Sequence, residues 1–291
     1  MAKIVKRRSL LLAAFLFIFT GTIFVKKFGF PPYYQTEQAV LELKKQSDFF
    51  EKKIDTPLQK IQLVQSGNPN NPPILFTHGS PGRWHAWADY LLDNALKEKA
   101  FMIAIDRPGF GFSDIGTHQP SLQKQAKVIL DAVQSQLGKD QKMIVVGHSY
   151  GGPVALRLAV DYPEKIQSLI LLAPSIDPDL EDNRWFNKLA SWPVVRALLP
   201  KAVDRSNQEI LVLQGELEAM KPLLKNLQTK VSIIQGAKDT LVPPGNATYG
   251  KEQLAKSDVG VKILAERGHF IPWQEYDLVK KTLFEHLSDF Y

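Results

Sequence analysis

Residues 143–152 read Met-Ile-Val-Val-Gly-His-Ser-Tyr-Gly-Gly, and they indicate most clearly how the chain folds. Its first four residues form a short apolar run without alternation, which is typical of a strand covered on both faces. Residues 153–159, Pro-Val-Ala-Leu-Arg-Leu-Ala, continue in a helical pattern. Between them, residues 147–151 have the pattern G-x-S-x-G, which marks a sharp turn from a strand into a helix. Because such a turn crowds the backbone, small residues must flank it on both sides, and the side chain of Ser149 is lifted clear of the sheet.

The same alternation of strand and helix extends outward from this turn in both directions. Short apolar runs predict strands at 61–65, 73–77, 100–105, 143–147, 166–173, 231–235 and 260–265. Helical patterns fill much of 84–98, 120–137, 151–161, 244–256 and 274–288. Alternation of this kind predicts an α/β fold, a doubly wound and mostly parallel sheet with right-handed crossovers.

One segment interrupts the alternation. Residues 174–230 separate two predicted strands, and a structureless loop of that length is improbable in a compact domain. We therefore predict a helical insertion at about 176–227, placed after the sixth core strand, where it could cover a site as a lid. Its aromatic residues Trp185, Phe186 and Trp192 are candidates for lining an apolar substrate pocket. The alternative is a set of helices that pack elsewhere on the domain.

The N-terminal segment has the features of a membrane anchor. Residues 9–25 carry no charged side chain, and as a helix they would span about 25 Å, enough for a bilayer core with basic ends. Four basic residues precede the run and two follow it, so the positive-inside rule predicts a single-pass helix with a cytoplasmic N-terminus. The rest of the chain would then be extracytoplasmic. The alternative is a signal sequence followed by secretion, although no small-x-small cleavage site follows the run.

These patterns predict three parts of the chain. Residues 1–30 are the anchor or signal-like segment, and 31–58, rich in Lys and Glu at 35–53, are expected to form a juxtamembrane helical linker. Residues 59–291 are the α/β domain with its insertion.

Composition excludes several classes of function. The net charge of +6 comes from 36 basic and 30 acidic residues, and six of the basic residues lie in 1–27, which hold no acid. The remainder is formally neutral, so we expect no nucleic-acid partner. The chain has no cysteine, which excludes a thiolate nucleophile and cysteine-ligated metal sites. With no H-x-x-x-H sequence either, we predict no metal and no cofactor.

A serine at such a turn acts as a nucleophile only when a base and an orienting acid stand beside it. The expected order along the chain is nucleophile, acid, histidine, and only two histidines follow Ser149. His269 comes directly after the last predicted strand, at the carboxyl edge where sites of such sheets assemble. His286 falls inside the C-terminal amphipathic helix and is expected at the surface. We therefore predict His269 as the base.

Asp239 is the predicted acid. It follows the strand 231–235 in the sequence Gly236-Ala-Lys-Asp239, again at a carboxyl edge. Its role would be to accept the Nδ1 proton of His269 and so fix the tautomer of the imidazole. Asp177 and Asp179, which follow the preceding strand, are the fallback candidates.

A tetrahedral intermediate also needs hydrogen-bond donors for its oxyanion. The sequence His78-Gly-Ser-Pro-Gly82 follows the strand 73–77 and lets the chain turn back toward the nucleophile. We predict that the backbone N–H groups of Ser80 and Tyr150 form this hole, since Pro81 has no N–H to donate. The side chains of His78 and Ser80 are expected only to support the turn.

Five motifs in this order resemble the α/β-hydrolase superfamily, and within it the lidded, esterase- or lipase-like serine hydrolases. They are His78–Gly82, Asp106-Arg-Pro-Gly-Phe-Gly-Phe-Ser-Asp114, Gly147–Gly151, Gly236–Asp239 and Gly268-His269. The resemblance covers residue 60 to the C-terminus and implies that 106–114 shape the floor beside the site. Ser149 departs from the aspartate nucleophile of the epoxide-hydrolase and haloalkane-dehalogenase branches. The turn at 78–82 also lacks the longer glycine run of many hormone-sensitive-type esterases.

The sequence therefore predicts a serine hydrolase that cleaves a carboxylic ester or related acyl bond of a small, hydrophobic substrate through an acyl-enzyme. Alternatives on the same triad are an amide or peptide hydrolase, a carbon–carbon bond hydrolase and an acyltransferase. A ligand-binding protein on the same scaffold is the non-enzymatic alternative, and the intact nucleophile, base and acid argue against it. The fold alone does not determine which of these functions the protein has, so the choice depends on the site.

Overall fold

The computed structural model describes residues 33–113, 119–138, 140–181 and 185–291. Contacts divide the chain into Met1–Gln35 and a compact unit, Thr36–Tyr291, that holds the whole sheet. The predicted transmembrane run at 9–25 lies outside the described residues. Within the described ranges, no helix is both long enough and apolar enough to cross a membrane.

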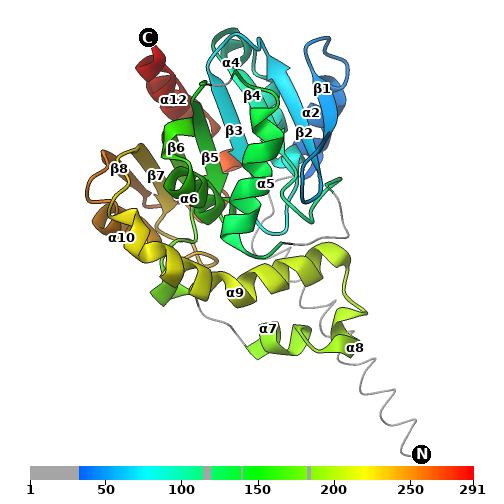
Figure 1. Cartoon of the computed structure of the whole chain (residues 1–291), viewed down its shortest axis with the longest axis vertical. Coiled ribbons are helices and arrows are strands. Elements are labelled where there is room, and N and C mark those ends of the chain that lie inside the picture. Colours follow the sequence, from blue (N-terminus) through cyan, green and yellow to red (C-terminus); the bar gives the residue numbers. More distant parts are fainter. Residues whose placement is uncertain (1–32, 114–118, 139, 182–184) are drawn as a thin grey trace, which may run out of the picture. The chain divides into compact units, whose positions relative to one another are not determined.

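An eight-stranded sheet forms the centre of the compact unit, in the order β1-β2-β4-β3-β5-β6-β7-β8 (Figure 1). The pairs β1–β2 and β2–β4 are antiparallel, and every later pair is parallel. The strands are β1 (Phe50–Asp55), β2 (Lys60–Gly67), β3 (Pro73–Thr77), β4 (Phe101–Ile105), β5 (Met143–His148), β6 (Ile166–Leu172), β7 (Lys230–Gly236) and β8 (Val259–Leu264). The predicted doubly wound, mostly parallel sheet is confirmed, and its strand order places β5, with the serine turn, in the middle.

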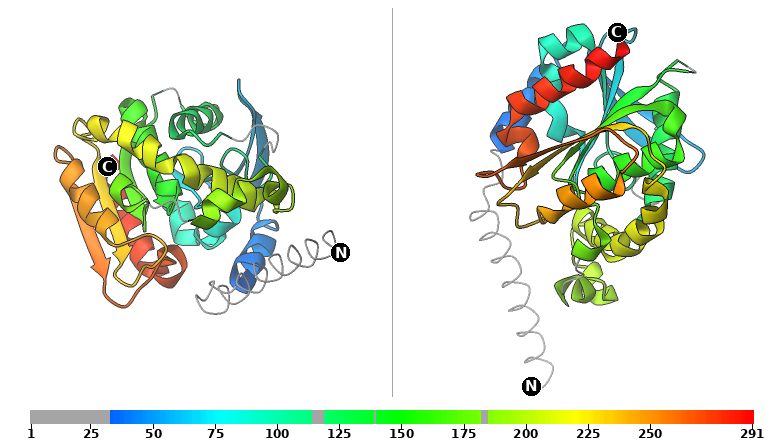
Figure 2. Two further views of the ribbon diagram at one scale, coloured as in Figure 1. Left: turned by 90° about the horizontal axis from the view of Figure 1, so that it is seen from below. Right: turned by 90° about the vertical axis from the view of Figure 1, so that its left-hand side faces the viewer.

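Helices cover both faces of this sheet (Figure 2). One face packs against α5 (Leu122–Gln134), α6 (Gly151–Asp161) and α10 (Gly245–Gln253), and the other against α2 (Tyr33–Leu43), the 3-10 turn η1 (Trp84–Trp87), α3 (Ala88–Leu92), α4 (Asn94–Lys99), α11 (Ile271–Gln274) and α12 (Tyr276–Leu287). Strand side chains alternate between the two cores: Leu75 packs on the α5–α6 side, and Ile74 and Phe76 pack on the opposite side. This two-sided burial explains why the central strands read as continuous apolar runs.

The prediction of a helical linker over 31–58 is wrong for its second half. Helix α2 ends at Leu43, and residues 50–55 form the edge strand β1, which pairs with β2 along its whole length. On α2, Ala39, Val40 and Leu43 are buried in the core, so the part of this helix from Thr36 onward belongs to the compact unit. The sequence pattern did not reveal this strand, because the side chains of Phe-Glu-Lys-Lys-Ile-Asp are mostly exposed and charged, as is typical of edge strands.

The insertion between β6 and β7 is helical, as expected. It contains the 3-10 turn η3 (Pro178–Leu180), α7 (Trp185–Ala190), α8 (Pro193–Arg196) and the long α9 (Lys201–Leu224). Helix α9 packs on the domain through four buried side chains, Leu213, Leu217, Met220 and Leu224. Helix α7 is tied to α9 by Asn187, whose Nδ2 donates to Asn207 Oδ1 at 2.9 Å. In Figure 1, α9 crosses one end of the sheet and α7 and α8 lie beyond it.

Candidate active site

The turn between β5 and α6 holds Ser149 in a left-handed backbone conformation, with φ at +55°. A Cβ atom added at Gly147 would lie 2.4 Å from Gly151 O, and one added at Gly151 would lie 2.3 Å from Thr77 O. No side chain fits in either place, which confirms the expectation that small residues must flank the serine. A non-glycine residue at positive φ is a strained arrangement, and strain of this kind gathers at functional sites.

Asp239 and His269 lie together at the carboxyl edge of the sheet, as predicted. His269 Nδ1 is 2.8 Å from Asp239 Oδ2, and both side chains are buried. Asp239 Oδ1 accepts the backbone N–H groups of Leu241 and Val242, each at 2.9 Å, and Gln235 Nε2 donates to Oδ2 at 3.1 Å. Four hydrogen bonds to one carboxylate fix its direction.

The fallback acids are engaged elsewhere. Asp177 Oδ1 accepts the backbone N–H of Asp179 at 3.0 Å and so caps the turn η3, whereas the side chain of Asp179 is exposed. Among the described contacts, only Asp239 pairs with the ring of His269. The geometry therefore favours Asp239 over the other two carboxylates.

Sequence reasoning missed His148, the variable residue before the serine. Its Nε2 lies 3.0 Å from His269 O, and since a carbonyl only accepts, Nε2 carries the hydrogen and donates it. Its ring centroid lies 4.8 Å from that of His269 and 5.3 Å from that of Trp273. Burial lowers the pKa of His148 to about 3, so the ring is neutral near pH 7. His148 thus ties the backbone of the predicted base to the serine turn without adding charge.

The expectation that His286 is a surface residue is wrong. His286 is fully buried, with Nδ1 2.7 Å from Ser168 Oγ and Nε2 2.8 Å from Ser232 Oγ, and so links α12 to β6 and β7. Burial lowers its pKa to about 4. The helical spacing of Val279, Leu283 and His286 puts it on the buried face, and this was the signal in the sequence that the prediction overlooked. Among the described hydrogen bonds, none joins His286 to Ser149 or Asp239, which leaves His269 as the base.

The loop at 78–82, called the oxyanion loop below, lies directly against the nucleophile. A Cβ atom added at Gly79 would lie 3.0 Å from Ser149 Cβ. Within the described part of the chain, neither the Ser80 nor the Tyr150 backbone N–H has a hydrogen-bond acceptor. Helix α6 begins at Gly151, so its N-terminal dipole also favours negative charge here. Two free donors beside a serine are what an oxyanion hole requires.

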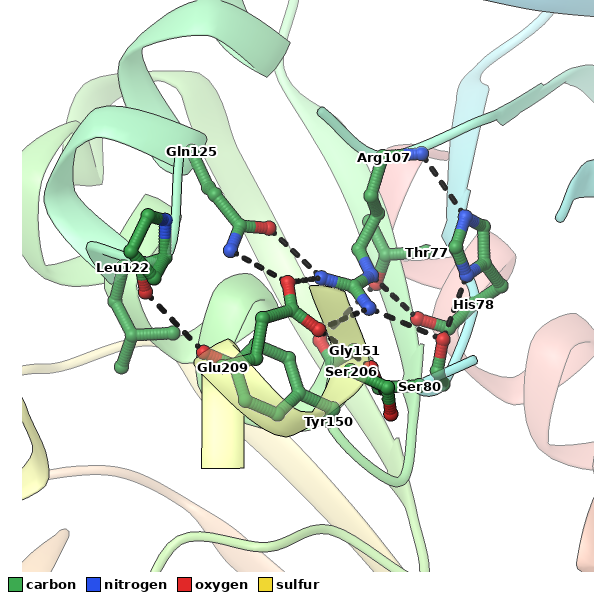
Figure 3. Close-up of polar contacts among 12 residues, drawn as sticks. Thr77, His78, Ser80, Arg107, Leu122, Gln125, Tyr150, Gly151, Ser206 and Glu209 are labelled. Carbon is green, nitrogen blue, oxygen red and sulfur yellow. Dashed lines mark hydrogen bonds and ion pairs between the residues drawn. The ribbon is translucent and has the colours of Figure 1, made fainter. Parts of the chain in front are cut away.

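Behind this loop lies a buried polar network that the sequence did not predict (Figure 3). Arg107 and Glu209, both completely buried, form an ion pair in which Nη1 lies 2.6 Å from Oε1. His78 Nε2 accepts the backbone N–H of Arg107 at 2.9 Å, so Nδ1 carries the hydrogen and donates to Gly79 O at 2.7 Å. Burial, aided by the nearby Arg107 charge, holds the pKa of His78 well below its usual value. His78 therefore supports the turn as a neutral ring, as expected.

The segment that follows β4 shapes the floor beside this network. Asp106 accepts the backbone N–H groups of Trp84 and Phe112, each at 2.7 Å, and burial raises its pKa to about 6. A Cβ atom added at Gly111 would lie 2.1 Å from the Asp106 carboxylate, so the carboxylate occupies the space a side chain would take. The contacts are structural, as the resemblance implied, although Asp114 itself lies outside the described residues.

Two of the three lid aromatics are exposed in this structure. Trp185 is 75% exposed and Trp192 is 62% exposed, while Phe186 is half-buried with its ring centroid 6.1 Å from that of Trp185. Helix α9 packs on the domain, and α7 and α8 contact α9 and each other. Within the part of the chain that the structure describes, no group of three or more His, Asp or Glu residues could hold a metal ion.

Known proteins resemble this chain in sequence over part of its length. The family model for the alpha/beta hydrolase fold matches residues 72–198, which include the oxyanion loop and Ser149. Epoxide hydrolase 1 of Caenorhabditis elegans is 38% identical over 117 residues, 39% of this chain and 28% of that protein. A proline iminopeptidase of Lactobacillus helveticus is 37% identical over 103 residues, 34% of this chain and 35% of that protein. The segments matched to three epoxide hydrolases span 28–31% of the relatives' own length.

Solved structures extend the likeness to the whole fold. A bacterial membrane phospholipase A superposes with a TM-score of 0.65 at 18% identity and covers 98% of both chains. The 2-hydroxy-6-oxo-6-phenylhexa-2,4-dienoate hydrolase of Rhodococcus sp. strain RHA1 superposes with a TM-score of 0.63 at 20% identity, over 82% of this chain and 99% of that one. Likeness at this identity concerns the fold alone. Together with the family match over residues 72–198 and the order of the motifs, it shows that the chain has the α/β-hydrolase fold.

Proposed function

We propose that this protein is a serine hydrolase that cleaves a carboxylic ester through an acyl-enzyme. Ser149 Oγ attacks the carbonyl carbon while His269 Nε2 takes its proton, and Asp239 stabilises the resulting imidazolium. The N–H groups of Ser80 and Tyr150 receive the oxyanion. His269 then gives the proton to the leaving alcohol, and a water molecule, activated by the same imidazole, hydrolyses the acyl-enzyme.

The observation that carries this proposal is the 2.8 Å contact between His269 Nδ1 and Asp239 Oδ2, at the same sheet edge as the strained Ser149 turn. A buried carboxylate that accepts from Nδ1 leaves Nε2 free to act as a base. Such a pairing has no evident purpose in a protein that only binds a ligand. It therefore supports an enzyme over the non-catalytic alternative.

We propose an ester, and not an epoxide, as the substrate because of the nucleophile and of the apolar side chains on the lid segment. The resemblance implies an aspartate nucleophile for epoxide opening, whereas this chain has Ser149. The lid segment, residues 176–227, exposes large apolar side chains that fit a hydrophobic acyl or alcohol group. The likeness to a proline iminopeptidase keeps amide cleavage as the second candidate, and carbon–carbon cleavage and acyl transfer could use the same triad.

We propose further that residues 9–25 anchor the protein in a membrane, with the N-terminus in the cytoplasm and the hydrolase domain on the other side. The support is the uncharged run between basic flanks in the sequence.

The proposed chemistry is tested by labelling and substitution at the nucleophile. An alkyl phosphonate carrying a fluorescent reporter should label the wild-type chain at Ser149 and should not label Ser149→Ala. The same variant should lose kcat on p-nitrophenyl esters by about 10⁴ or more, because acylation is lost. A folded Ser149→Ala protein with near-wild-type esterase activity would exclude the covalent mechanism.

A further inference from the structure

Helix α9 of the lid segment carries a buried carboxylate into contact with the oxyanion loop. Glu209 is fully buried, and its Oε2 accepts the hydroxyl hydrogen of Ser80 at 2.5 Å (Figure 3). The hydroxyl of Ser206, one turn earlier on α9, lies 3.0 Å from Ser80 Oγ. The residue expected to give its N–H to the oxyanion is thus held through its side chain by the insertion.

Arg107 fixes the other side of the same loop. Its Nε donates to His78 O at 2.8 Å and its Nη2 donates to Gly79 O at 3.1 Å. Its remaining donors reach Glu209 Oε1 at 2.6 Å, Glu209 Oε2 at 3.1 Å and Gln125 Oε1 at 2.8 Å. A guanidinium offers five N–H groups in a rigid fork, and every direction of that fork is used here.

Aromatic rings complete the surroundings of the guanidinium. The Cζ atom of Arg107 lies 4.8 Å from the ring centroid of Phe110 and 4.8 Å from that of Tyr150. Tyr150 is the residue that supplies the second predicted oxyanion donor. The same guanidinium therefore contacts the loop that carries one donor and the side chain of the residue that carries the other.

Glu209 receives hydrogen bonds on both oxygens. Gln125 Nε2 donates to Oε1 at 2.8 Å, in addition to the bonds from Arg107 and Ser80. Burying an ion pair gains little net stability, because desolvation of both charges offsets their attraction. A fully hydrogen-bonded buried pair does, however, hold its neighbours in one geometry. Because this network lies behind the oxyanion loop, the geometry that it holds is that of the loop.

We propose that Glu209 is a positioning residue for the oxyanion hole and acts through the Ser80 hydroxyl. The carboxylate fixes the rotation of the oxyanion loop, so that the Ser80 N–H points to the place where negative charge develops. Donors of this kind contribute only when they are aimed before the reaction, because the gain comes from preorganisation. The proposal rests on the serine-hydrolase function above and adds to it that the insertion completes the catalytic site.

Ser80→Ala is the cleanest test, because it removes the contact and leaves the Arg107–Glu209 pair intact. On a p-nitrophenyl ester we expect kcat to fall about tenfold, less than the 10²–10³ loss for removing an oxyanion donor outright, since the N–H remains but is no longer held. KM should change less than twofold. The acidic limb of the pH–rate profile should keep its shape, since His269 is not altered. Ser80→Thr, which keeps the hydroxyl, should recover most of the loss.

Glu209→Gln tests the carboxylate itself, and Glu218→Gln is its matched control. Glu218 lies on the exposed side of the same helix, so its substitution removes one charge from α9 without touching the network. We expect a loss in kcat of tenfold or more for Glu209→Gln and wild-type kinetics for Glu218→Gln. Thermal melting of each variant gives the folded fraction, by which every kcat is corrected.

The outcomes separate this proposal from the proposed function. A wild-type chain that neither reacts with the phosphonate nor cleaves esters means that the function itself is wrong. An active wild type, with folded Ser80→Ala and Glu209→Gln variants that keep wild-type kcat, overturns the positioning role alone. Losses that vanish after correction for the folded fraction overturn it too, because Glu209 then only stabilises the fold.

Discussion

The conformation of Ser149 is set by its neighbours and not by its own preference. Backbone atoms fill the space beside Gly147 and Gly151, so the chain can turn there only because both residues lack a Cβ. The positive φ of the serine costs about 1–3 kcal/mol for a non-glycine residue. Gly79 adds the third close approach, since it brings the oxyanion loop to the serine. Three glycines on two loops therefore determine where the nucleophile stands relative to its donors.

The choice of acid can be decided by two single substitutions. Asp239→Asn should lower kcat by about 10³–10⁴, because an amide at this position can no longer hold His269 in the required tautomer or stabilise its charged form. Asp177→Asn should leave kcat within about twofold, because Asp177 only caps a 3-10 turn. The measurement is kcat on one ester for both folded variants. A larger loss in Asp177→Asn than in Asp239→Asn would reverse the assignment.

Single site residues could be predicted from the sequence where a chemically suitable side chain follows a predicted strand. Ser149, Asp239 and His269 each follow a strand at its carboxyl end, and the sequence pattern locates strands well. His148 and Glu209 carry no such marker. His148 stands at the variable position of the motif, and Glu209 lies 102 residues from the arginine it pairs with. A contact between two helical or loop residues that far apart depends on the packing of the insertion, which no local pattern encodes.

Among the elements, the hydrophobic pattern of the sequence failed to predict the strand β1, whereas the length of the insertion predicted that it is helical. The central strands are buried on both faces and read as apolar runs, whereas β1 is an edge strand with mostly exposed side chains. Period and composition therefore could not separate β1 from a polar linker. The insertion was expected as helices because of its length, and it is helical. Its contacts could not be predicted, because the packing of α9 brings together residues far apart in the sequence, such as Arg107 and Glu209.

The exposed aromatics of the lid predict a dependence on acyl length. Trp185→Ala and Trp192→Ala should each lower kcat/KM several-fold for p-nitrophenyl esters of long acyl chains and leave the acetate unchanged, because only a long chain can reach apolar surface on α7 and α8. Thermal stability should change little, since both side chains are exposed. Leu41→Ala, on the exposed side of α2, is the control for loss of surface apolar area. Equal losses on short and long esters would exclude these residues from acyl recognition.

At the scale of the whole molecule, buried neutral histidines make stability depend on pH. His286 has its pKa lowered to about 4 by burial, while in the unfolded chain a histidine titrates near 6.5. As pH falls below 6.5 the unfolded state takes up a proton that the folded state refuses, so stability is lost down to about pH 4. His78, His85 and His148, whose pKa values are also lowered, act in the same direction.

His286→Gln should remove the contribution of His286 to the pH dependence of the unfolding free energy. An uncharged amide can still reach Ser168 and Ser232, but it cannot take up a proton in the unfolded state. Between pH 8 and pH 5 the variant should lose about 2 kcal/mol less unfolding free energy than the wild type. Urea unfolding at the two pH values measures this difference. Identical losses in both proteins would mean that His286 does not contribute, and esterase activity per folded molecule should be the same in both.

The membrane proposal concerns residues 9–25, which lie outside the described residues, and fractionation of cells tests it. Full-length protein should sediment with membranes and resist extraction by 1 M salt, because burying residues 9–25 gains about 25 cal/mol per Å² of apolar area and salt screens only charge. Deleting residues 1–30 should release an active hydrolase, since α2 begins at Tyr33 and the domain keeps all its elements. Leu16→Lys, which places a charge in the middle of the apolar run, is the matched full-length control and should weaken retention.

Protease added to cells with a permeabilised outer envelope then reports orientation. The basic residues before the run outnumber those after it by four to two, so the hydrolase domain should be digested while the cytoplasm stays sealed. A protected domain would mean that the orientation is reversed. A mature chain that begins after residue 25 would mean that the segment is a cleaved signal and that the hydrolase is released, because nothing in the formally neutral remainder would hold it to an anionic surface.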